Sequence, residues 1–346
     1  MATMTDVAKA ANVSVMTVSR VLNNSGYVKQ ETRQAIEKAI KELDYRPNLL
    51  AKSLVTGKSN IIAYVLSDIS DQFYGSVCKG VEATCLSRGY TAIICNADAS
   101  QNVDNYIRMI IDRKLDGVIF HHLPVTAEQI ELLQEHHIQC VTVDNEIVLE
   151  QVTSIDSDDY RGALKAIQHL YSCGYQKIGC VCGEDKNILS GEKTHQEQYQ
   201  HRIWEERTRG YYDGLKMCGL KSAGMYYGRG SADIHTSFEC GRSIMKALLE
   251  EENIPDALYC QSDIIAMGIL NVLLEAEQPL PNVAIVGHDG LDICNLMHPR
   301  LTTVVQPKYE MGMMAANMLL DRIDKNELPI EHKIVESHLY IGETTR

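Results

Sequence analysis

A pattern of helix caps and valines in residues 5–22 constrains the fold of this chain more than any other feature of its sequence. Thr5 and Ser14 are each placed to cap a helix, because a hydroxyl oxygen can accept a hydrogen bond from an unpaired backbone N–H of the first turn. Asn12 lies between the two expected helices and suits the backbone angles of a tight turn. The pattern therefore predicts a helix-turn-helix unit whose second helix covers residues 14–22.

The apolar residues of this unit predict its core. Val13, Val18 and Val21 are expected to face inward from the second helix and from the turn before it. A third helix should close the core, because six residues recur at helical spacing as one apolar stripe: Thr32, Ala35, Ile36, Ala39, Ile40 and Leu43.

The outer face of the second helix is the expected DNA-reading surface. Arg20 can form two hydrogen bonds with a guanine, whereas Val15 and Met16 offer apolar contacts, for instance to thymine methyl groups. The alternative is an ordinary helical hairpin in a core, which leaves this outer face unexplained.

Five stretches resemble the DNA-binding headpiece and hinge of the lac repressor family: Asp6-Val7-Ala8, Val13-Ser14, Thr17-Val18-Ser19-Arg20-Val21-Leu22-Asn23, Tyr45-Arg46-Pro47-Asn48 and Ala51-Lys52-Ser53-Leu54. Motifs of the family's ligand-binding body continue to about Gln306, so the resemblance covers nearly the whole chain. It implies a DNA-binding set with these members: Thr5, Ser14, Val15, Met16, Thr17, Ser19, Arg20, Asn23, Asn48, Ala51, Lys52 and Leu54.

The hinge of this resemblance covers residues 47–59. It begins at a proline, a favoured first helical residue, and it is too short to form a stable helix without a partner. The family inserts a leucine into the minor groove at the centre of a palindrome, and Leu54 matches that residue. The alternative is that Leu54 packs on the body. Lys52 stands where the family often has Arg, which keeps the attraction to phosphate but loses a bidentate fork.

Charge is divided unevenly along the 346 residues. Residues 1–59 hold nine Lys or Arg and five Asp or Glu, a net charge of +4, whereas the remainder holds 24 and 41, a net charge of −17. Only the first segment is therefore suited to phosphates, and the acidic remainder should repel nucleic acid.

The cysteines and the hydropathy of the chain indicate its cellular compartment. Eleven cysteines in a chain of this length, several beside strand-like runs, indicate buried reduced thiols in a cytoplasmic protein rather than a secreted disulfide scaffold. No apolar run is long enough to span or target a membrane.

From residue 60 onward, short apolar strands alternate with amphipathic helices in two successive series. This alternation predicts an α/β body of two doubly wound lobes with parallel sheets and a central cleft, as in periplasmic binding proteins, and the lac repressor family is built in the same way. A polar run over 184–206 is expected to form a loop bordering the cleft. The expected domains are a headpiece over 1–46, a hinge over 47–59, and a body over 60–346 with lobes of approximately 60–156 plus 290–308, and 157–289 plus 309–346.

Aromatic and acidic residues follow strands of this body. Phe73 and Tyr74 come after the first strand, where the family commonly has aromatic residues that stack on a sugar ring or base, although either could belong to the core. Asp144 and Asp289 lie at carboxyl ends of strands, where ligands bind in such sheets, and their carboxylates can accept hydrogen bonds from sugar hydroxyls. Capping of a loop or helix is the alternative, and it is stronger for Asp144.

The resemblance adds further effector-binding residues. Arg207 matches a family arginine that reaches the cleft with a planar donor fork. Ser262 and Asp263 stand where the family usually has Asn-Asp, so a typical amide contact is missing and the effector could be atypical. The expected effector-binding set is Phe73, Tyr74, Asp144, Arg207, Ser262, Asp263 and Asp289.

Other motifs fail as metal or catalytic sites. The acidic run 156–159 lacks the glycine and the distal glutamate of a calcium loop, and it is expected to cap the helix that follows. The His and Cys pairs have no complementary pair at zinc-site spacing, and no hydrolase or metalloprotease motif occurs. We therefore expect no metal, no cofactor and no enzyme activity.

These observations predict a cytoplasmic, homodimeric transcription repressor that binds a palindromic operator of double-stranded DNA. Its effector is expected to be a small molecule, a sugar or sugar derivative first, with a purine or a protein co-repressor as alternatives. The rival hypothesis is a cytosolic sugar-binding or sugar-processing protein whose N-terminal helices serve assembly. The charge of the first segment and the placement of Arg20 and Leu54 argue against it.

Overall fold

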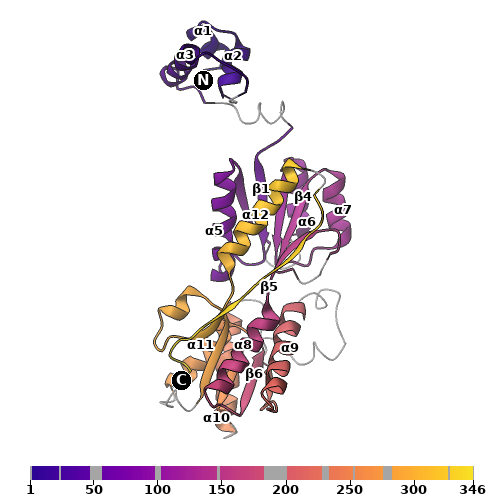
Figure 1. Ribbon diagram of the computed structural model, residues 1–346, viewed down its shortest axis with the longest axis vertical. Helices are drawn as coiled ribbons and strands as arrows, with labels where there is room; N and C mark the ends of the chain where they lie inside the picture. Colours follow the sequence, from indigo (N-terminus) through magenta and orange to yellow (C-terminus); the bar gives the residue numbers. More distant parts are fainter. Residues whose placement is uncertain are drawn as a thin grey trace. The chain divides into compact units, whose positions relative to one another are not determined.

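The computed structural model describes residues 2–22, 25–46, 57–97, 103–145, 149–182, 201–227, 234–251, 254–275, 283–325 and 328–345. The chain divides between Ser59 and Asn60 into two compact units (Figure 1). Among the described residues, no helix combines the length and apolar character needed to cross a membrane. All eleven cysteines lie in these ranges as free thiols, and eight of them are buried.

The first unit contains three helices: α1 (Met4–Ala10), α2 (Val15–Leu22) and α3 (Gln30–Glu42). Ser14 caps α2, since its hydroxyl accepts a hydrogen bond from the Thr17 N–H at 3.2 Å. The expected cap at Thr5 is wrong, because Thr5 lies inside α1 and Thr3 caps that helix. The Thr3 hydroxyl accepts from the Asp6 N–H at 3.3 Å, and the Asp6 carboxylate accepts from the Thr3 N–H at 2.8 Å. Only Thr3 has an acidic residue three positions later, and that pair completes a capping box.

The core of this unit agrees with the sequence pattern except on α3. Val18 and Val21 are buried, Val13 packs beside them, and Asn12 has a positive φ of 51°. The stripe of α3 is narrower than expected, because Ala35 and Leu43 at its edges are exposed. The buried core residues are Val7, Ala8, Val18, Val21, Ile36, Ala39 and Tyr45.

The first lobe of the second unit is a six-stranded parallel sheet. Its strand order is β11-β5-β4-β3-β1-β2. The strands are β1 (Ile61–Leu66), β2 (Thr91–Asn96), β3 (Gly117–His121), β4 (Gln139–Val143), β5 (Thr153–Ser157) and β11 (His332–Val335). One face packs on α5 (Gln72–Ser87) and α12 (Lys308–Asp324), and the other on α6 (Val103–Asp112) and α7 (Ala127–Glu135) (Figure 1).

The second lobe has a six-stranded sheet of order β12-β10-β9-β8-β6-β7, parallel except for the β10–β12 pair. Its strands are β6 (Ile178–Cys182), β7 (Met225–Tyr227), β8 (Ala257–Cys260), β9 (Ala284–Asp289), β10 (Thr302–Val305) and β12 (His338–Tyr340). One face packs on α8 (Asp159–Ser172) and α9 (His201–Met217), and the other on α10 (Ile234–Glu250) and α11 (Asp263–Glu275). A 3-10 helix, η4 (Asp292–Asn295), follows β9.

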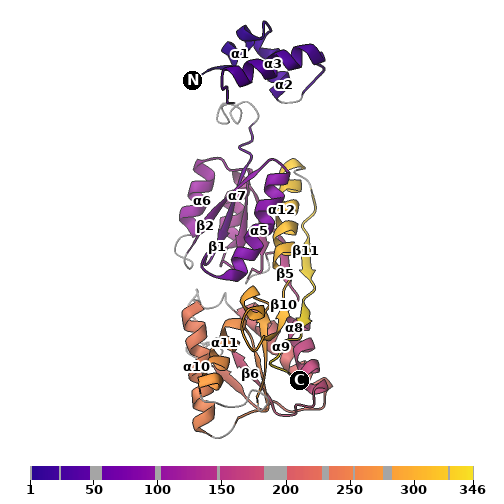
Figure 2. The same ribbon diagram turned by 90° about the vertical axis from the view of Figure 1, so that its left-hand side faces the viewer.

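The lobe boundaries differ from those expected from the sequence. β10 pairs within the second sheet, although 290–308 was expected in the first lobe. α12 packs on the first lobe, although 309–346 was expected in the second. A Cβ atom on Gly80 of α5 would lie 2.1 Å from the Tyr309 carbonyl oxygen, so glycine permits the close approach of α5 and α12. The chain therefore crosses between lobes three times, at β5–α8, β10–α12 and β11–β12, and Figure 2 shows the last segment passing along both lobes.

The polar run 184–206 is only partly described. Residues 184–200 of the expected loop lie outside the described ranges. The expectation is wrong for residues 201–206, because α9 begins at His201 and this stretch is helical. Its polar residues carry no apolar stripe, so periodicity alone could not extend the helix back to that point.

Candidate DNA-reading helix and effector site

The outer face of α2 carries the residues expected to read DNA. Val15 is 42% exposed and Met16 is 66% exposed, although both are apolar. Arg20 is also exposed, and its Nη2 lies 3.8 Å from the Met16 Sδ. Thr17 and Ser19 are half-buried at the sides of this face. Thr5 on α1 and Ser14 before α2, which were also expected to contact DNA, are exposed. The remaining expected DNA contacts lie outside the described residues: Asn23, Asn48, Ala51, Lys52 and Leu54.

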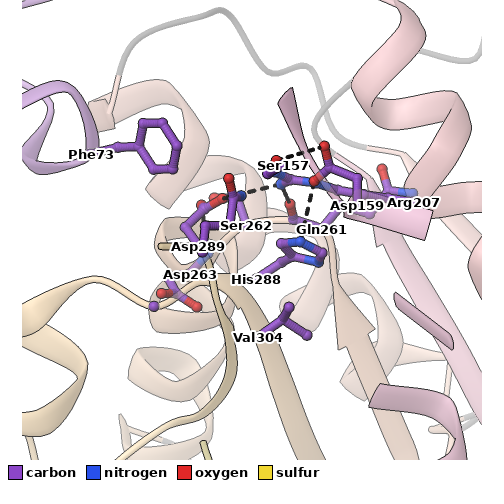
Figure 3. Close-up of polar contacts among 12 residues, drawn as sticks. Phe73, Ser157, Asp159, Arg207, Gln261, Ser262, Asp263, His288, Asp289 and Val304 are labelled. Atoms are coloured by element: carbon purple, nitrogen blue, oxygen red, sulfur yellow. Dashed lines mark hydrogen bonds and ion pairs between the residues drawn. The ribbon is translucent and has the colours of Figure 1, made fainter. Parts of the chain in front are cut away.

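The cleft edge of the second lobe is built around the Arg207 guanidinium. Arg207 Nε donates to Asp159 Oδ1 at 2.7 Å, and Nη1 lies 3.2 Å from Asp289 Oδ1 and donates to the Gln261 carbonyl oxygen (Figure 3). Three separate elements supply these acceptors: Asp159 begins α8, Gln261 follows β8, and Asp289 ends β9. They meet because the carboxyl ends of parallel strands lie at one edge of the sheet.

His288 extends this network toward the interior. Its Nε2 lies 3.3 Å from Asp159 Oδ1, and its Nδ1 lies 2.7 Å from the Tyr259 hydroxyl. Burial lowers the pKa of His288 to about 4, so the imidazole is neutral at neutral pH. Burial opposes ionisation of Asp159, but Arg207 and His288 together hold its pKa down at about 2. The result is a charged Asp159–Arg207 pair beside a neutral histidine.

Asp289 is the carboxylate of this network most open to the cleft. Its side chain is 16% exposed, and Gln306 Nε2 donates to it at 3.1 Å. Burial raises the pKa of Asp289 to about 8 against the opposing effect of Arg207, and the neighbouring Asp263 carboxylate adds to the rise. The group can therefore hold or lose a proton near neutral pH, which suits a ligand hydroxyl that either accepts or donates.

Ser262 and Asp263 have partners within the second lobe. Asp263 is fully buried and accepts hydrogen bonds from Thr303 Oγ1 at 2.5 Å and from the Leu291 N–H at 2.8 Å. Ser262 Oγ accepts from the Ile264 N–H at 3.2 Å and so caps α11. These two residues position the neighbouring loop and helix around the network.

The first lobe contributes aromatic residues from the start of α5. Asp71 caps this helix, since its carboxylate accepts from the Phe73 N–H at 2.8 Å. Phe73 packs against the hydrophobic cores of both lobes, and Figure 3 shows it across from the Asp289 cluster. Tyr74 places its ring edge-on to His121 at 4.7 Å between centroids.

Asp144 lies beneath these rings and is buried. Its Oδ1 accepts from the Ser157 N–H at 2.8 Å, which matches the capping alternative. Its Oδ2 lies 3.9 Å from His121 Nε2, and His121 Nδ1 lies 2.6 Å from the Tyr64 hydroxyl. Burial raises the pKa of Asp144 and lowers the pKa of His121, so the His121 imidazole is neutral at neutral pH.

Sequence reasoning missed several residues of this site. Asp159 belongs to the acidic run that was expected to cap the next helix, and Asp158 is the residue that caps α8. Lys308 follows the helix-starting Pro307, yet its Nζ donates to the Asp289 and Gly290 carbonyl oxygens and lies 5.7 Å from the Phe73 ring centre. Gln261 and His288 resembled ordinary strand ends. A charged or amide residue next to a predicted strand end was the available signal.

Comparison with known proteins identifies the family. Residues 3–48 match "Bacterial regulatory proteins, lacI family", and residues 167–345 match a "Periplasmic binding protein-like domain". The HTH-type transcriptional repressor CytR of Escherichia coli strain K12 is 30% identical over 350 residues, covering 100% of this chain and 96% of that protein. The chain belongs to the LacI family of bacterial regulatory proteins.

Two solved structures share the fold. A transcriptional regulator CelR–cellobiose complex is 26% identical with a TM-score of 0.69, covering 99% of this chain and 100% of that one. The lac repressor dimer bound to operator and the anti-inducer ONPF is 22% identical with a TM-score of 0.80, covering 99% of each chain. The chain is thus a helix-turn-helix transcription regulator with a two-lobed body. Within the described residues, no group of three or more His, Cys, Asp or Glu is arranged to hold a metal.

Proposed function

We propose that this regulator represses transcription by binding a palindromic operator as a homodimer in the cytoplasm, under the control of a carbohydrate bound at the Arg207 site. The observation that carries the effector proposal is the Arg207–Asp159–Asp289 network, opposite the aromatic ring of Phe73. An arginine fork and carboxylates suit the paired hydroxyls of a sugar, and an aromatic ring suits its apolar face. The similar structure of the transcriptional regulator CelR in complex with cellobiose supports this ligand class.

The proposed control is a shift between closure states of the two lobes. Three crossovers join the lobes, so a change in closure moves one sheet relative to the other. A ligand that contacts Asp289 in the second lobe and Phe73 in the first favours one closure state. It changes DNA affinity only by the difference between its affinities for the two states.

The DNA-binding part of the proposal is tested by selection from a random pool of duplexes. We expect the full chain to enrich a palindrome and residues 60–346 alone to enrich nothing. Arg20→Ala should weaken binding to that palindrome by about 5-fold to 150-fold, because a bidentate base contact contributes about 1–3 kcal/mol. Lys38→Ala is the control: Lys38 is exposed on α3 and pairs with Glu42 at 3.8 Å. Equal binding by the Arg20→Ala variant would refute the assignment of this helix.

The effector part is tested by calorimetry of the full chain with neutral sugars, beginning with cellobiose and ribose. A sugar that binds should lose its affinity in the Arg207→Lys variant, which retains the charge but not the planar fork. It should also change the affinity for the selected palindrome. A sugar that binds equally to both proteins would exclude Arg207 as its ligand.

A further inference from the structure

A cavity lies in the second lobe beside the Arg207 network. Its volume is about 230 Å³, and it lies between α9 and the carboxyl ends of β6, β7 and β8. Three of its walls are aromatic, from Trp204, Tyr212 and Tyr227. Its remaining neutral lining comes from Cys182, Thr208 and Gln261.

The aromatic walls follow from helix geometry and strand order. Trp204, Thr208 and Tyr212 are spaced four residues apart on α9, so they lie on one face of the helix. Tyr227 is the last residue of β7, the edge strand next to β6. This arrangement turns several ring surfaces toward one space, which suits a flat ring that stacks or packs edge-on.

Gln261 supplies an independent indication of a ligand. Its side chain is completely buried, and its Nε2 donates to Thr208 Oγ1 at 2.8 Å. Its Oε1 is buried and has no hydrogen-bond partner among the parts of the chain that the structure describes. A buried acceptor without a donor is unfavourable, and nearly all such groups in proteins are satisfied by protein, water or ligand. The cavity therefore contains a position for an N–H or O–H donor.

Two charged residues complete the lining, Glu205 and Arg209, and both are exposed at the rim. Arg209 Nη2 donates to Glu206 at 2.5 Å, and its guanidinium lies 4.4 Å from the Tyr160 ring centre. The rest of the lining is uncharged, so away from the rim the cavity offers no counter-ion to a charged occupant.

We propose that this cavity binds a flat, uncharged heteroaromatic ring whose N–H donates to Gln261 Oε1. The main-chain carbonyl of Gln261 also accepts a hydrogen bond from Arg207. An occupant of the cavity therefore contacts a residue that holds the guanidinium. The proposal concerns this cavity alone and does not depend on which molecule binds at Asp289.

Trp204 makes the test specific, because it is the only tryptophan in the chain. Benzimidazole and 1-methylbenzimidazole are the probes, since they share a ring system and only the first carries an N–H. We expect benzimidazole to change the Trp204 emission of the full chain with saturation, and the methylated probe to bind at least about tenfold more weakly. The Trp204→Phe variant provides the spectroscopic blank.

Two variants locate the contact. Gln261→Met keeps the length of the side chain but removes the acceptor, and it should reduce benzimidazole affinity about tenfold while leaving the methylated probe unchanged. Tyr171→Phe, on the exposed part of α8, should change neither. Three outcomes would each overturn the proposal. Benzimidazole could give no saturable signal, the two probes could bind with equal affinity, or Gln261→Met could bind benzimidazole as well as the parent chain does. If Gln261→Met does not fold, the comparison of the two probes on the parent chain still tests the proposal.

Discussion

The two lobes present sheets of similar topology to the cleft, but the chemistry at their carboxyl ends is opposite. In the second lobe, Asp159 lies 2.7 Å from Arg207, and its pKa falls to about 2. In the first lobe, Asp144 lies 3.9 Å from the neutral His121, and burial raises its pKa. Asp144 follows β4 and Asp159 begins α8, and both are buried beside a histidine. The difference shows that a close ion pair can lower the pKa of a carboxylate that burial alone would raise.

This difference assigns separate tasks to the two lobes. The second lobe holds a fixed charged network that can orient polar groups of a ligand. The first lobe offers Phe73 and Tyr74, whose rings can cover an apolar face. Phe73 is also where the lobes meet, because it packs on both cores and lies beneath Lys308.

Removal of the central cation should have the largest effect. Arg207→Met leaves Asp159 and Asp289 buried without their partner, and it should lower the free energy of unfolding by about 3–5 kcal/mol. Urea unfolding of the full chain measures this loss. Arg209→Met is the matched control on the same helix: Arg209 is 58% exposed, and its pair with Glu206 should contribute less than about 1 kcal/mol. Equal losses in the two variants would contradict the charged-network assignment.

The contact between the lobes should have the next largest effect. Phe73→Ala removes a ring that packs on both cores, and it should lower the free energy of unfolding by about 2 kcal/mol, since the site is only partly buried. Phe73→Leu keeps an apolar contact and should lose about 1 kcal/mol or less. Hydrogen exchange should show faster exchange at the start of α5 and at η4 in the alanine variant, because the Ile293 N–H donates to Gln72 across the lobes at 3.5 Å. Unchanged exchange at η4 would mean that Phe73 does not hold the lobes together.

The sequence predicted this architecture further than it predicted the site. Ser14, Val18 and Val21 identified the helix-turn-helix because caps and helical spacing are local properties. Arg207 and Asp289 were expected in one cleft, and the structure brings them within 3.2 Å. The prediction for Asp289 needed only the rule that strand ends meet at one edge of a sheet, whereas the prediction for Arg207 came from the resemblance to the lac repressor family.

The remaining features depend on packing between distant segments. Nothing local in 302–305 or 308–324 indicates which sheet they join, and the lobe boundaries were therefore wrong. Asp263 faces inward because Gly287 leaves space for its carboxylate, with a would-be Cβ only 2.2 Å from Asp263 Oδ1. The aromatic cavity combines Trp204 with Tyr227, which are separated by a turn between helix and strand, and no periodicity connects them.

The two buried aspartates should respond to pH with opposite signs. The folded-state pKa of Asp159 is depressed from 3.8 to about 2, so its contribution is present above about pH 4 and is lost as the pH falls through about 2. Asp159→Asn should therefore cost about 2 kcal/mol at neutral pH. The folded-state pKa of Asp144 is raised, so its ionisation destabilises the fold as the pH rises. Asp144→Asn keeps the acceptor for the Ser157 N–H and should be at least as stable as the parent, with an advantage that grows with pH. Urea unfolding across the pH range would contradict the comparison if the two variants shifted in the same direction.

The smallest effects should come from two ion pairs that lie away from the cleft and are equivalent in the two lobes. Arg88 joins α5 to α12 through Asp321 at 2.7 Å, and Arg242 joins α10 to α11 through Glu275 at 3.1 Å. Their acceptors are 56% and 54% exposed, so solvent screens both pairs to a similar extent. Arg88→Met and Arg242→Met should each lower the free energy of unfolding only slightly, and by nearly equal amounts. Equal losses in these two variants, together with a large loss in Arg207→Met, would show that the lobes differ only at their cleft edges. A loss at either pair close to that of Arg207→Met would show instead that the lobes differ throughout.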